Sequence, residues 1–389
     1  MTARRLVIED KVRPYPLALV APDHFRARDA GPVDPAVVVE APNVSLYCLD
    51  PVRREAVFVE TDPGVDLTAA PFFFEAQYDA ARALITVGFS ELHDLADQVP
   101  SEHRRLILVY SIGRCGSTLI GRALARLGGA TLLSEPDVFT QLVALRAGSP
   151  GADGLTPDDV SHLVRSCARL MFAPPRLGWL GGSQARRLGG SEVLAVKFRS
   201  FVIELAEVLH AHLPVARVVF AYRHAVAWTR STLRAFGAYD PSMAQTLAPA
   251  QDRLGRLVPL LARYRAGQGR VLTPVEAMAC QWVSQMERAV ALRKAGVAMH
   301  AVRYEDLCAR PRVQLAALLA HCGLPTGSSV VLDRVLAEDS QAGTTLARDR
   351  LADLDDALDE SAVVELKRVI AELSHIVTPD LILHNGLSG

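Results

Sequence analysis

Two short segments of the chain combine arginine and hydroxyl residues, the first of them with glycine, in a way that suits a bound anion. The first is RCGST, residues 114–118, which follows an apolar run and precedes an amphipathic helical pattern. Glycines let the backbone approach a ligand, helix N-termini attract negative charge, and arginine offers a planar fork of donors. Five arginines and no acid occur from Arg104 to Arg126. We therefore expect an oxyanion to be bound by Arg114, Cys115, Gly116, Ser117 and Thr118.

The second segment is VVFAYRHAVAWTRS, residues 218–231. Arg223 ends a strand pattern here, and Ser231 lies eight residues further on, about two helical turns away. Both side chains can address one ligand group if the helix folds back on the strand. Taken alone, the segment also suits an arginine-rich helix exposed to solvent, and this alternative stays open.

The first segment departs from the loop of nucleotide-hydrolysing enzymes. In GxxxxGK[ST] a lysine contacts the phosphates and a hydroxyl binds Mg²⁺, whereas Ser117 takes the place of that lysine here. No predicted strand ends in an aspartate suited to Mg²⁺, which disfavours phosphoryl transfer from ATP. Because Glu135 follows a strand, a Mg-dependent P-loop kinase remains one alternative, and a non-enzymatic nucleotide-binding protein is another.

Two further residues that follow strand patterns are candidates for catalysis. Glu135 could take a proton from a hydroxyl group, or Ser134 or Glu135 could cap a helix that begins at Pro136. Lys197, one of four lysines in the chain, could stabilise charge on a departing oxygen, or it could form a structural ion pair. The sequence leaves both pairs of alternatives open.

The elements that must position these residues are short buried strands that alternate with helices. This alternation is typical of an α/β fold with a parallel sheet flanked by helices. We expect strands at residues 106–110, 131–133, 193–196, 216–222 and 298–304. Helices are expected at residues 201–212, 225–236, 275–294 and 311–322.

The first hundred residues have a different pattern. Short β-rich runs at Val37–Val39, Val44–Leu49 and Ala56–Thr61 indicate a small sheet, and helices are expected at Pro71–Val87 and Ser90–Val99, with Ser90 as N-cap. We therefore predict a small N-terminal α+β unit over residues 1–100 and an α/β domain over residues 101–389. The N-terminal unit could shape a substrate pocket or form a homodimer.

Composition narrows the classes of partner. The chain carries 42 basic and 43 acidic residues, so no excess of charge indicates nucleic acid or an anionic membrane. No apolar run approaches the roughly 18 residues of a spanning helix, and the first ten residues lack a secretory apolar segment. The six cysteines are scattered and form no CxxC motif. We expect a cytoplasmic protein with no nucleic-acid or membrane partner.

Taken together, the two segments resemble the sulfotransferase family, whose P-loop NTPase-like fold binds 3′-phosphoadenosine 5′-phosphosulfate (PAPS). RCGSTLI, residues 114–120, matches the family pattern R-x-G-[ST]-T-x-[LI], and Arg223 with Ser231 matches its strand-end arginine and the serine eight residues later. VRYEDLCARPRVQLAALLAHCGLP, residues 302–325, is similar to the family's strand, turn and helix. The resemblance covers about residues 104–325. It implies sulfuryl transfer from PAPS, without a metal, to the hydroxyl of a small-molecule acceptor.

The resemblance also implies a role for each residue. The loop at 114–118 would hold the 5′-phosphosulfate, and Arg223 with Ser231 would hold the 3′-phosphate. Protein-tyrosine and some bacterial members place a glutamate base where Glu135 lies, 21 residues past Arg114. Cytosolic members use a histidine base in a K-x-H motif. Here Arg199 replaces that histidine and cannot act as a base, while Lys197 would assist the leaving phosphate. The segment Asp339–Arg350 would close over the nucleotide.

Overall fold

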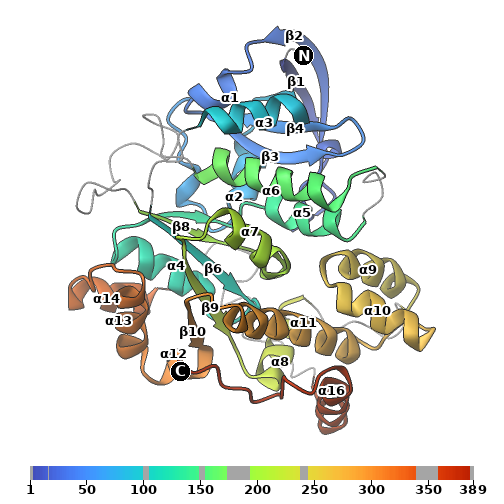
Figure 1. Cartoon of the computed structure of the whole chain (residues 1–389), viewed down its shortest axis with the longest axis vertical. Helices are drawn as coiled ribbons and strands as arrows, with labels where there is room; N and C mark the ends of the chain where they lie inside the picture. The colour runs from blue at the N-terminus through green and yellow to red at the C-terminus, as the bar shows by residue number, and fades with distance from the viewer. Residues whose placement is uncertain are drawn as a thin grey trace. The chain divides into compact units, whose positions relative to one another are not determined.

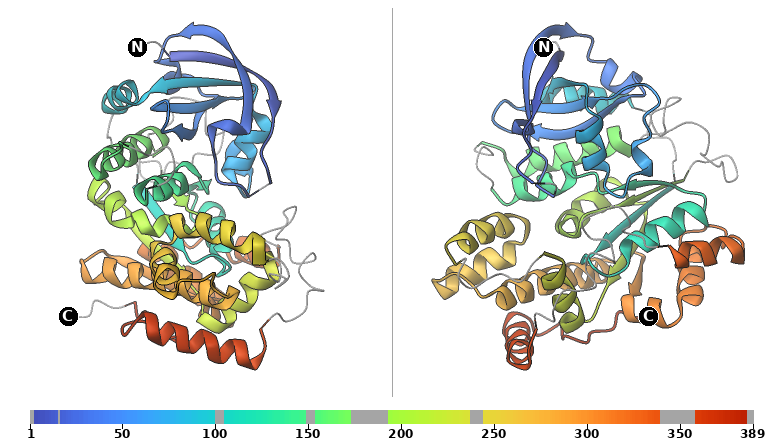
Figure 2. Two further views of the ribbon diagram at one scale, coloured as in Figure 1. Left: turned by 90° about the vertical axis from the view of Figure 1, so that its right-hand side faces the viewer. Right: turned by 180° about the vertical axis from the view of Figure 1, so that it is seen from behind.

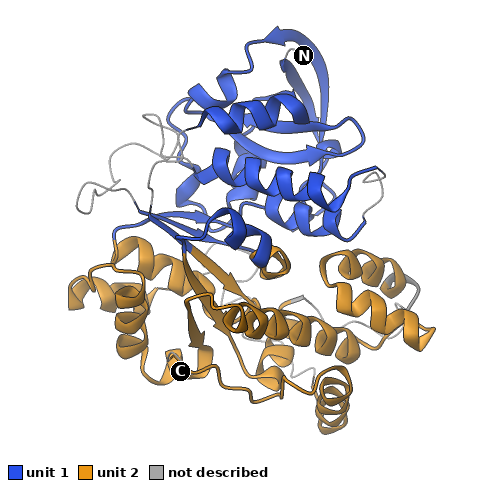
Figure 3. Cartoon of the chain, viewed as in Figure 1, with its two compact units in different colours: residues 1–107, 129–199, 207–216 blue, residues 108–128, 200–206, 217–389 orange. Residues whose placement is uncertain are grey.

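The computed structural model describes residues 3–15, 17–99, 105–148, 154–172, 193–236, 244–338 and 358–385 (Figure 1). The chain forms two compact units (Figure 3). Unit 1 comprises Met1–Ile107, Gly129–Arg199 and Glu207–Ala216, and unit 2 comprises Leu108–Gly128, Ser200–Ala206 and Arg217–Gly389. The division near residue 100, which follows a change in sequence pattern, stays a prediction.

The first sheet belongs to unit 1 and contains five antiparallel strands in the order β2-β1-β5-β4-β3. The strands are β1 (Ala3–Lys11), β2 (Phe25–Val33), β3 (Val44–Asp50), β4 (Glu55–Glu60) and β5 (Ala83–Gly88). Figure 2 shows β1 and β2 as a long curved hairpin, and the register of β1 shifts twice against β2. Such bulges bend a strand and increase its twist. The predicted N-terminal α+β character is therefore confirmed.

Several local predictions in this region were wrong. Residues 37–39 are not a strand but part of α1 (Val37–Glu40), a single turn that starts where the Asp34 carboxylate accepts the Ala36 N–H at 2.9 Å. The helix expected at residues 71–87 ends early: α2 (Phe73–Ala80) stops, and its β-branched continuation becomes β5, paired between β1 and β4. The next helix, α3 (Phe89–Gln98), has Gly88 rather than Ser90 as its N-cap.

The second sheet contains five strands in the order β10-β9-β6-β8-β7, and the β9–β10 and β7–β8 pairs are parallel. The strands are β6 (Arg105–Ser111), β7 (Thr131–Ser134), β8 (Val193–Lys197), β9 (Arg217–Tyr222) and β10 (Met299–Arg303). Each lies within one residue of its predicted bounds at either end. With the helices that flank it (Figure 1), this sheet confirms the predicted α/β fold class.

Helices connect these strands or follow them. They are α4 (Ser117–Arg126), α5 (Val138–Arg146), α6 (Pro157–Phe172), α7 (Ala206–His212), α8 (Ala225–Phe236), α9 (Ala244–Leu257), α10 (Pro259–Gln268), α11 (Pro274–Lys294), α12 (Tyr304–Ala309), α13 (Pro311–His321), α14 (Ser329–Ala337) and α16 (Glu360–Leu373). The predicted helix at residues 201–212 divides into a 3₁₀ turn, η3 (Ser200–Leu205), and α7. None of the described helices is long and apolar enough to cross a membrane.

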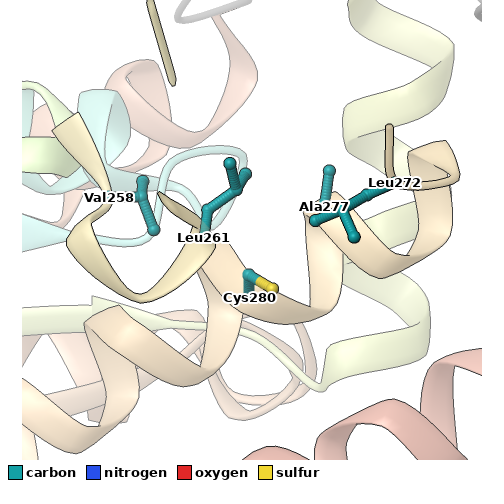
Figure 4. Close-up of a cluster of buried hydrophobic side chains, with 5 residues drawn as sticks. All are labelled: Val258, Leu261, Leu272, Ala277 and Cys280. Carbon is teal, nitrogen blue, oxygen red and sulfur yellow. The ribbon is translucent and has the colours of Figure 1, made fainter. Parts of the chain in front are cut away.

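A small apolar core in unit 2 fixes the long helix α11. Its buried members are Val258, Leu261, Leu272, Ala277 and Cys280 (Figure 4), and partly buried side chains from α9, α10, η3 and α16 pack against them. The first turn of α11 carries a capping box in which Thr273 and Glu276 satisfy each other's backbone N–H groups. This packing anchors a helix that contributes directly to the site described next.

Candidate active site

The strand order marks one place in unit 2 where a ligand is expected. Strands β6 and β9 are neighbours, yet the chain leaves β6 for β7 on one side and leaves β9 for β10 on the other. In parallel sheets, ligands bind beyond the carboxyl ends of two strands whose connections diverge in this way. The loop after β6 carries residues 112–116, and Arg223 follows β9 directly. Both predicted anion-binding segments therefore lie where the neighbouring strands β6 and β9 end.

The loop after β6 has an unusual backbone. Gly113, Arg114 and Gly116 have φ angles of 74°, 50° and 81°, in the left-handed region. A residue with a side chain at such an angle typically costs about 1–3 kcal/mol and often marks a functional site. Gly116 is also the N-cap of α4, and a Cβ there would lie 3.1 Å from Leu307 and 3.3 Å from Tyr304. This position therefore favours glycine for its conformation, and an added Cβ would also crowd the two neighbouring side chains.

Hydrogen bonds from three buried donor groups hold the loop in this shape. The carbonyl oxygen of Ala221, in β9, accepts the Ile112 N–H at 3.1 Å and the Cys115 thiol at 3.2 Å. The buried indole N–H of Trp228 donates to the carbonyls of Ile112 at 3.0 Å and Gly113 at 3.1 Å. Burial raises the pKa of the Cys115 thiol to about 12. The Cys115 side chain is thus an anchor for the loop, in its protonated form.

The two predicted anion-binding segments meet in the structure. The Arg114 Nε lies 3.4 Å from the Ser231 Oγ, and an Arg223 N–H donates to the Arg114 carbonyl at 3.4 Å. The Arg223 guanidinium lies 4.4 Å from the centre of the Tyr304 ring, and its Nε is 4.0 Å from a Glu305 carboxylate oxygen. The guanidinium groups of Arg114 and Arg223 and the hydroxyl group of Ser231 therefore converge where β6 and β9 end.

Ser117 and Thr118 occupy the first turn of α4 and are largely buried, with exposed fractions of 7% and 9%. Their positions agree with the predicted strand, loop and helix. Sequence reasoning missed the part played by Trp282 of α11, whose indole N–H donates to the Arg223 carbonyl at 3.1 Å. A buried tryptophan needs a partner for its N–H, but the sequence does not reveal which one.

Unit 1 carries the two predicted catalytic residues, and they form an ion pair. Glu135 follows β7 with a φ angle of 60°. Its N–H donates to the Lys197 carbonyl at 2.6 Å, and its carboxylate accepts from the Lys197 ammonium at 2.5 Å. The side chains are 14% and 3% exposed, and the ammonium lies 5.8 Å from the centre of the Phe72 ring. Lys197 therefore forms the ion pair that the sequence offered as one alternative, here with Glu135. A catalytic role for either residue stays a prediction.

The helix-capping alternative for Ser134 and Glu135 was wrong. Helix α5 begins at Val138 with Asp137 as its N-cap, and no side chain caps it. The Ser134 hydroxyl instead donates to the Pro71 carbonyl at 2.7 Å, and the Glu135 carboxylate binds Lys197. Neither side chain is therefore explained by the start of the following helix.

A second ion pair lies next to the first and was not predicted. The Arg199 guanidinium donates to both carboxylate oxygens of Asp137, at 3.0 and 2.9 Å. Asp137 also accepts the Val20 N–H at 3.2 Å, and Arg199 donates to the Leu17 carbonyl at 3.2 Å. Burial raises the pKa of Asp137, and the charge of Arg199 opposes this rise. The side chain of Asp137 is completely buried.

Among the described ranges, no group of three or more His, Cys, Asp or Glu side chains is arranged to hold a metal ion. The predicted absence of a metal stays a prediction. The segment 339–350, which we expected to close over a nucleotide, lies outside the described residues.

Comparison with known proteins gives a family match. A model described as the sulfotransferase family matches residues 107–328. No curated protein sequence matches the chain. Among solved structures, the chain is similar to a sulfotransferase from Alicyclobacillus acidocaldarius, with 12% identity over 70% of this chain and 92% of that chain and a TM-score of 0.38.

It is also similar to sulfotransferase STF1 from Mycobacterium tuberculosis, with 17% identity over 73% of this chain and 82% of that chain and a TM-score of 0.38. Mouse sulfotransferase SULT7A1 complexed with PAP shows 10% identity over 72% of this chain and 87% of that chain, again with a TM-score of 0.38. The family match, and not these low scores, carries the assignment. Because the matched residues make up more than half of the chain and include both predicted anion-binding segments, the chain belongs to the sulfotransferase family and is an enzyme that transfers a sulfuryl group.

Proposed function

We propose that the sulfuryl donor is PAPS and that the convergent groups in unit 2 bind it. The observation that carries this proposal is the approach of Arg223 and Ser231 to Arg114, with N···O distances of 3.4 Å in both contacts. Two anion-binding segments that are about a hundred residues apart in the sequence thus lie within reach of one doubly phosphorylated nucleotide. We assign the 5′-phosphosulfate to residues 114–118 and the 3′-phosphate to Arg223 and Ser231.

The chemistry of these groups suits a sulfuryl donor. Left-handed residues that alternate with residues of negative φ, as Arg114 and Gly116 do around Cys115, turn successive backbone N–H groups toward one side, which forms a concave site for an oxyanion. The helix dipole of α4 and the guanidinium of Arg114 add positive charge. A phosphosulfate carries less charge than a triphosphate, so donors of this kind can hold it without a bridging Mg²⁺. We accordingly propose that transfer needs no metal.

We further propose that Glu135 is the base and that Lys197 assists the leaving group. In this scheme Glu135 accepts the proton of the acceptor hydroxyl while the hydroxyl oxygen bonds to sulfur. The bond between sulfur and the bridging oxygen breaks, its electron pair stays on the departing phosphate, and Lys197 stabilises that charge. Support comes from the close contact between the two side chains and from the left-handed backbone of Glu135.

The acceptor, on this proposal, is a small molecule with a hydroxyl group. We also propose that the protein acts in the cytoplasm, because its six cysteines are scattered and suit a reducing compartment. We propose that it uses neither nucleic acid nor a membrane as partner, because its charge is balanced. A homodimer formed through the N-terminal unit is part of the same proposal.

Titration calorimetry with adenosine 3′,5′-bisphosphate (PAP) tests the donor site. We expect micromolar binding that EDTA leaves unchanged, and weaker binding of ATP with or without Mg²⁺. Because a ligand of the native state raises its melting temperature, a thermal-shift series should give the same ranking. Tight binding of ATP that depends on Mg²⁺, with no binding of PAP, would overturn the proposal and favour a kinase.

A further inference from the structure

The first hundred residues of the chain contact the segments that carry Glu135 and Lys197. Leu17 accepts a hydrogen bond from Arg199, Val20 donates one to Asp137, and Pro71 accepts one from Ser134. Leu17, Val20 and Pro71 all lie outside the residues that the family model matches. The part of unit 1 that precedes the matched residues therefore meets the two segments proposed to take part in catalysis.

Two neighbouring ion pairs join the segment that follows β7 to the end of β8 and the residues after it. Ser134 pairs with Lys197 across β7 and β8, and both segments then continue beyond the sheet. Glu135 binds Lys197, and two residues further along each segment Asp137 binds Arg199. Both pairs join the same two segments, so the second pair restrains the backbone that carries the first. Each pair retains partial exposure at one partner, Glu135 or Arg199, whereas the Asp137 carboxylate has none.

The Asp137–Arg199 pair is poorly explained as a source of stability alone. Asp137 is the N-cap of α5, where an aspartate usually caps the helix, yet its side chain binds Arg199 and Val20 instead. Replacing both partners of a buried ion pair with uncharged groups is often neutral or stabilising, because burial of charge is costly. Because the buried Asp137 carboxylate does not cap α5, we argue that its pairing with Arg199 serves to fix the position of the segment that carries it.

We infer that Asp137, Arg199 and residues 17–20 are positioning residues for the Glu135–Lys197 pair. They hold the segment 135–137 in the conformation that keeps Glu135 left-handed and in contact with Lys197. The N-terminal region thus takes part in sulfuryl transfer without touching the reacting atoms. The inference rests on the proposed function only in giving the Glu135–Lys197 pair a chemical task.

The test uses the reactivity of lysine, because the chain has only Lys11, Lys197, Lys294 and Lys367. The full-length protein is treated with N-hydroxysuccinimidyl acetate, and mass spectrometry gives the acetylation rate at each lysine. Lys197, whose side chain is 3% exposed and paired, should react slowly. In the double variant Arg199→Met with Asp137→Asn, which leaves no unpaired buried charge, we expect the rate at Lys197 to rise at least tenfold. The other three lysines should stay within twofold of their original rates.

A matched control removes a different ion pair of unit 1. Arg5→Met with Glu60→Gln breaks a pair whose atoms are 2.8 Å apart and should leave Lys197 slow. Arg199→Lys keeps the charge but cannot bind Asp137 and Leu17 as the guanidinium does, so an intermediate rise of roughly threefold is expected. If the double variant does not fold, Arg199→Lys carries the test alone.

An unchanged rate at Lys197 in a variant that melts like the original protein would overturn the inference. A rise at all four lysines would do the same, because it would indicate general loosening. PAP binding and the turnover of Glu135→Gln test the proposed function separately. Should Glu135→Gln retain turnover, Glu135 would not be the base, and the acetylation rates would still decide whether Arg199 positions the pair.

Discussion

The donor loop in unit 2 and the double ion pair in unit 1 use charge in different ways. At the loop, the Arg114 Nε contacts the Ser231 hydroxyl, Arg223 donates to the Arg114 carbonyl, and the Arg223 Nε lies 4.0 Å from a Glu305 carboxylate oxygen. At the ion pairs, Lys197 and Arg199 each bind a carboxylate of their own. The first arrangement suits charge brought by a ligand, and the second suits exact placement of side chains. Ligand binding and turnover should therefore respond separately to mutation.

The largest expected effect is on turnover. Glu135→Gln removes the proposed base but leaves a side chain of the same size, so kcat should fall roughly 10²- to 10⁴-fold. The dissociation constant for PAP, measured by calorimetry, should change less than twofold. Sulfation of the best acceptor from a panel of phenols and alcohols gives kcat, and Glu60→Gln, which breaks another ion pair of unit 1, is the control. Retained turnover, or a large loss of PAP binding, would break the comparison.

The next effect concerns the nucleotide. Arg223→Glu removes a guanidinium and places a carboxylate beside Glu305, so the dissociation constant for PAP should rise by roughly 100-fold. Arg217→Glu makes the same change at the other end of β9, where the side chain is exposed, and should have little effect. If both variants bound PAP normally, Arg223 would have no part in the donor site.

A smaller effect is expected from the loop backbone. Gly116→Ala puts a Cβ at a φ angle of 81° and 3.1 Å from Leu307, which should lower the free energy of unfolding by roughly 1–2 kcal/mol and weaken PAP binding about tenfold. Urea unfolding and calorimetry measure the two effects. Gly267→Ala, in α10 with open space around the added Cβ, is the control and should be neutral or stabilising. Equal effects at the two glycines would contradict the assigned role of the loop conformation.

The smallest effect is a difference in response to pH. Burial, with His321 and Arg293 nearby, lowers the pKa of His300 in unit 2 to about 4. The unfolded chain binds this proton more readily, so the free energy of unfolding should fall as the pH drops from about 6.5 to about 4. Asp137 in unit 1 responds to pH in the opposite direction. Burial raises its pKa in the folded protein, so ionisation of this carboxyl lowers the free energy of unfolding as the pH rises. His300→Phe should remove roughly 1 kcal/mol of the acid destabilisation, measured by urea unfolding at pH 7 and pH 5.

The elements that hold the donor loop could be predicted because their signals are local. Buried apolar strands end at glycine, arginine or serine, so β6 and β9 were placed within one residue at either end. The strands β1 and β2 were missed because charged residues interrupt them and because β1 also pairs with β5, which lies far along the chain. The same holds for the Asp137–Arg199 pair, which depends on Leu17 and Val20. Contacts of this kind leave no periodic signal in a sequence.

The anchoring of the Cys115 thiol has a practical consequence for labelling. Maleimides and related reagents attack thiolates, and a buried thiol with a pKa of about 12 should resist them. Of the six cysteines, five are buried, and Cys308 in α12 is exposed. The same helix begins with Tyr304, whose ring lies 4.4 Å from the Arg223 guanidinium and would be 3.3 Å from a Cβ added at Gly116. A maleimide fluorophore added to the wild-type protein should therefore react at Cys308 alone. From this position beside the donor loop, its fluorescence should report nucleotide exchange.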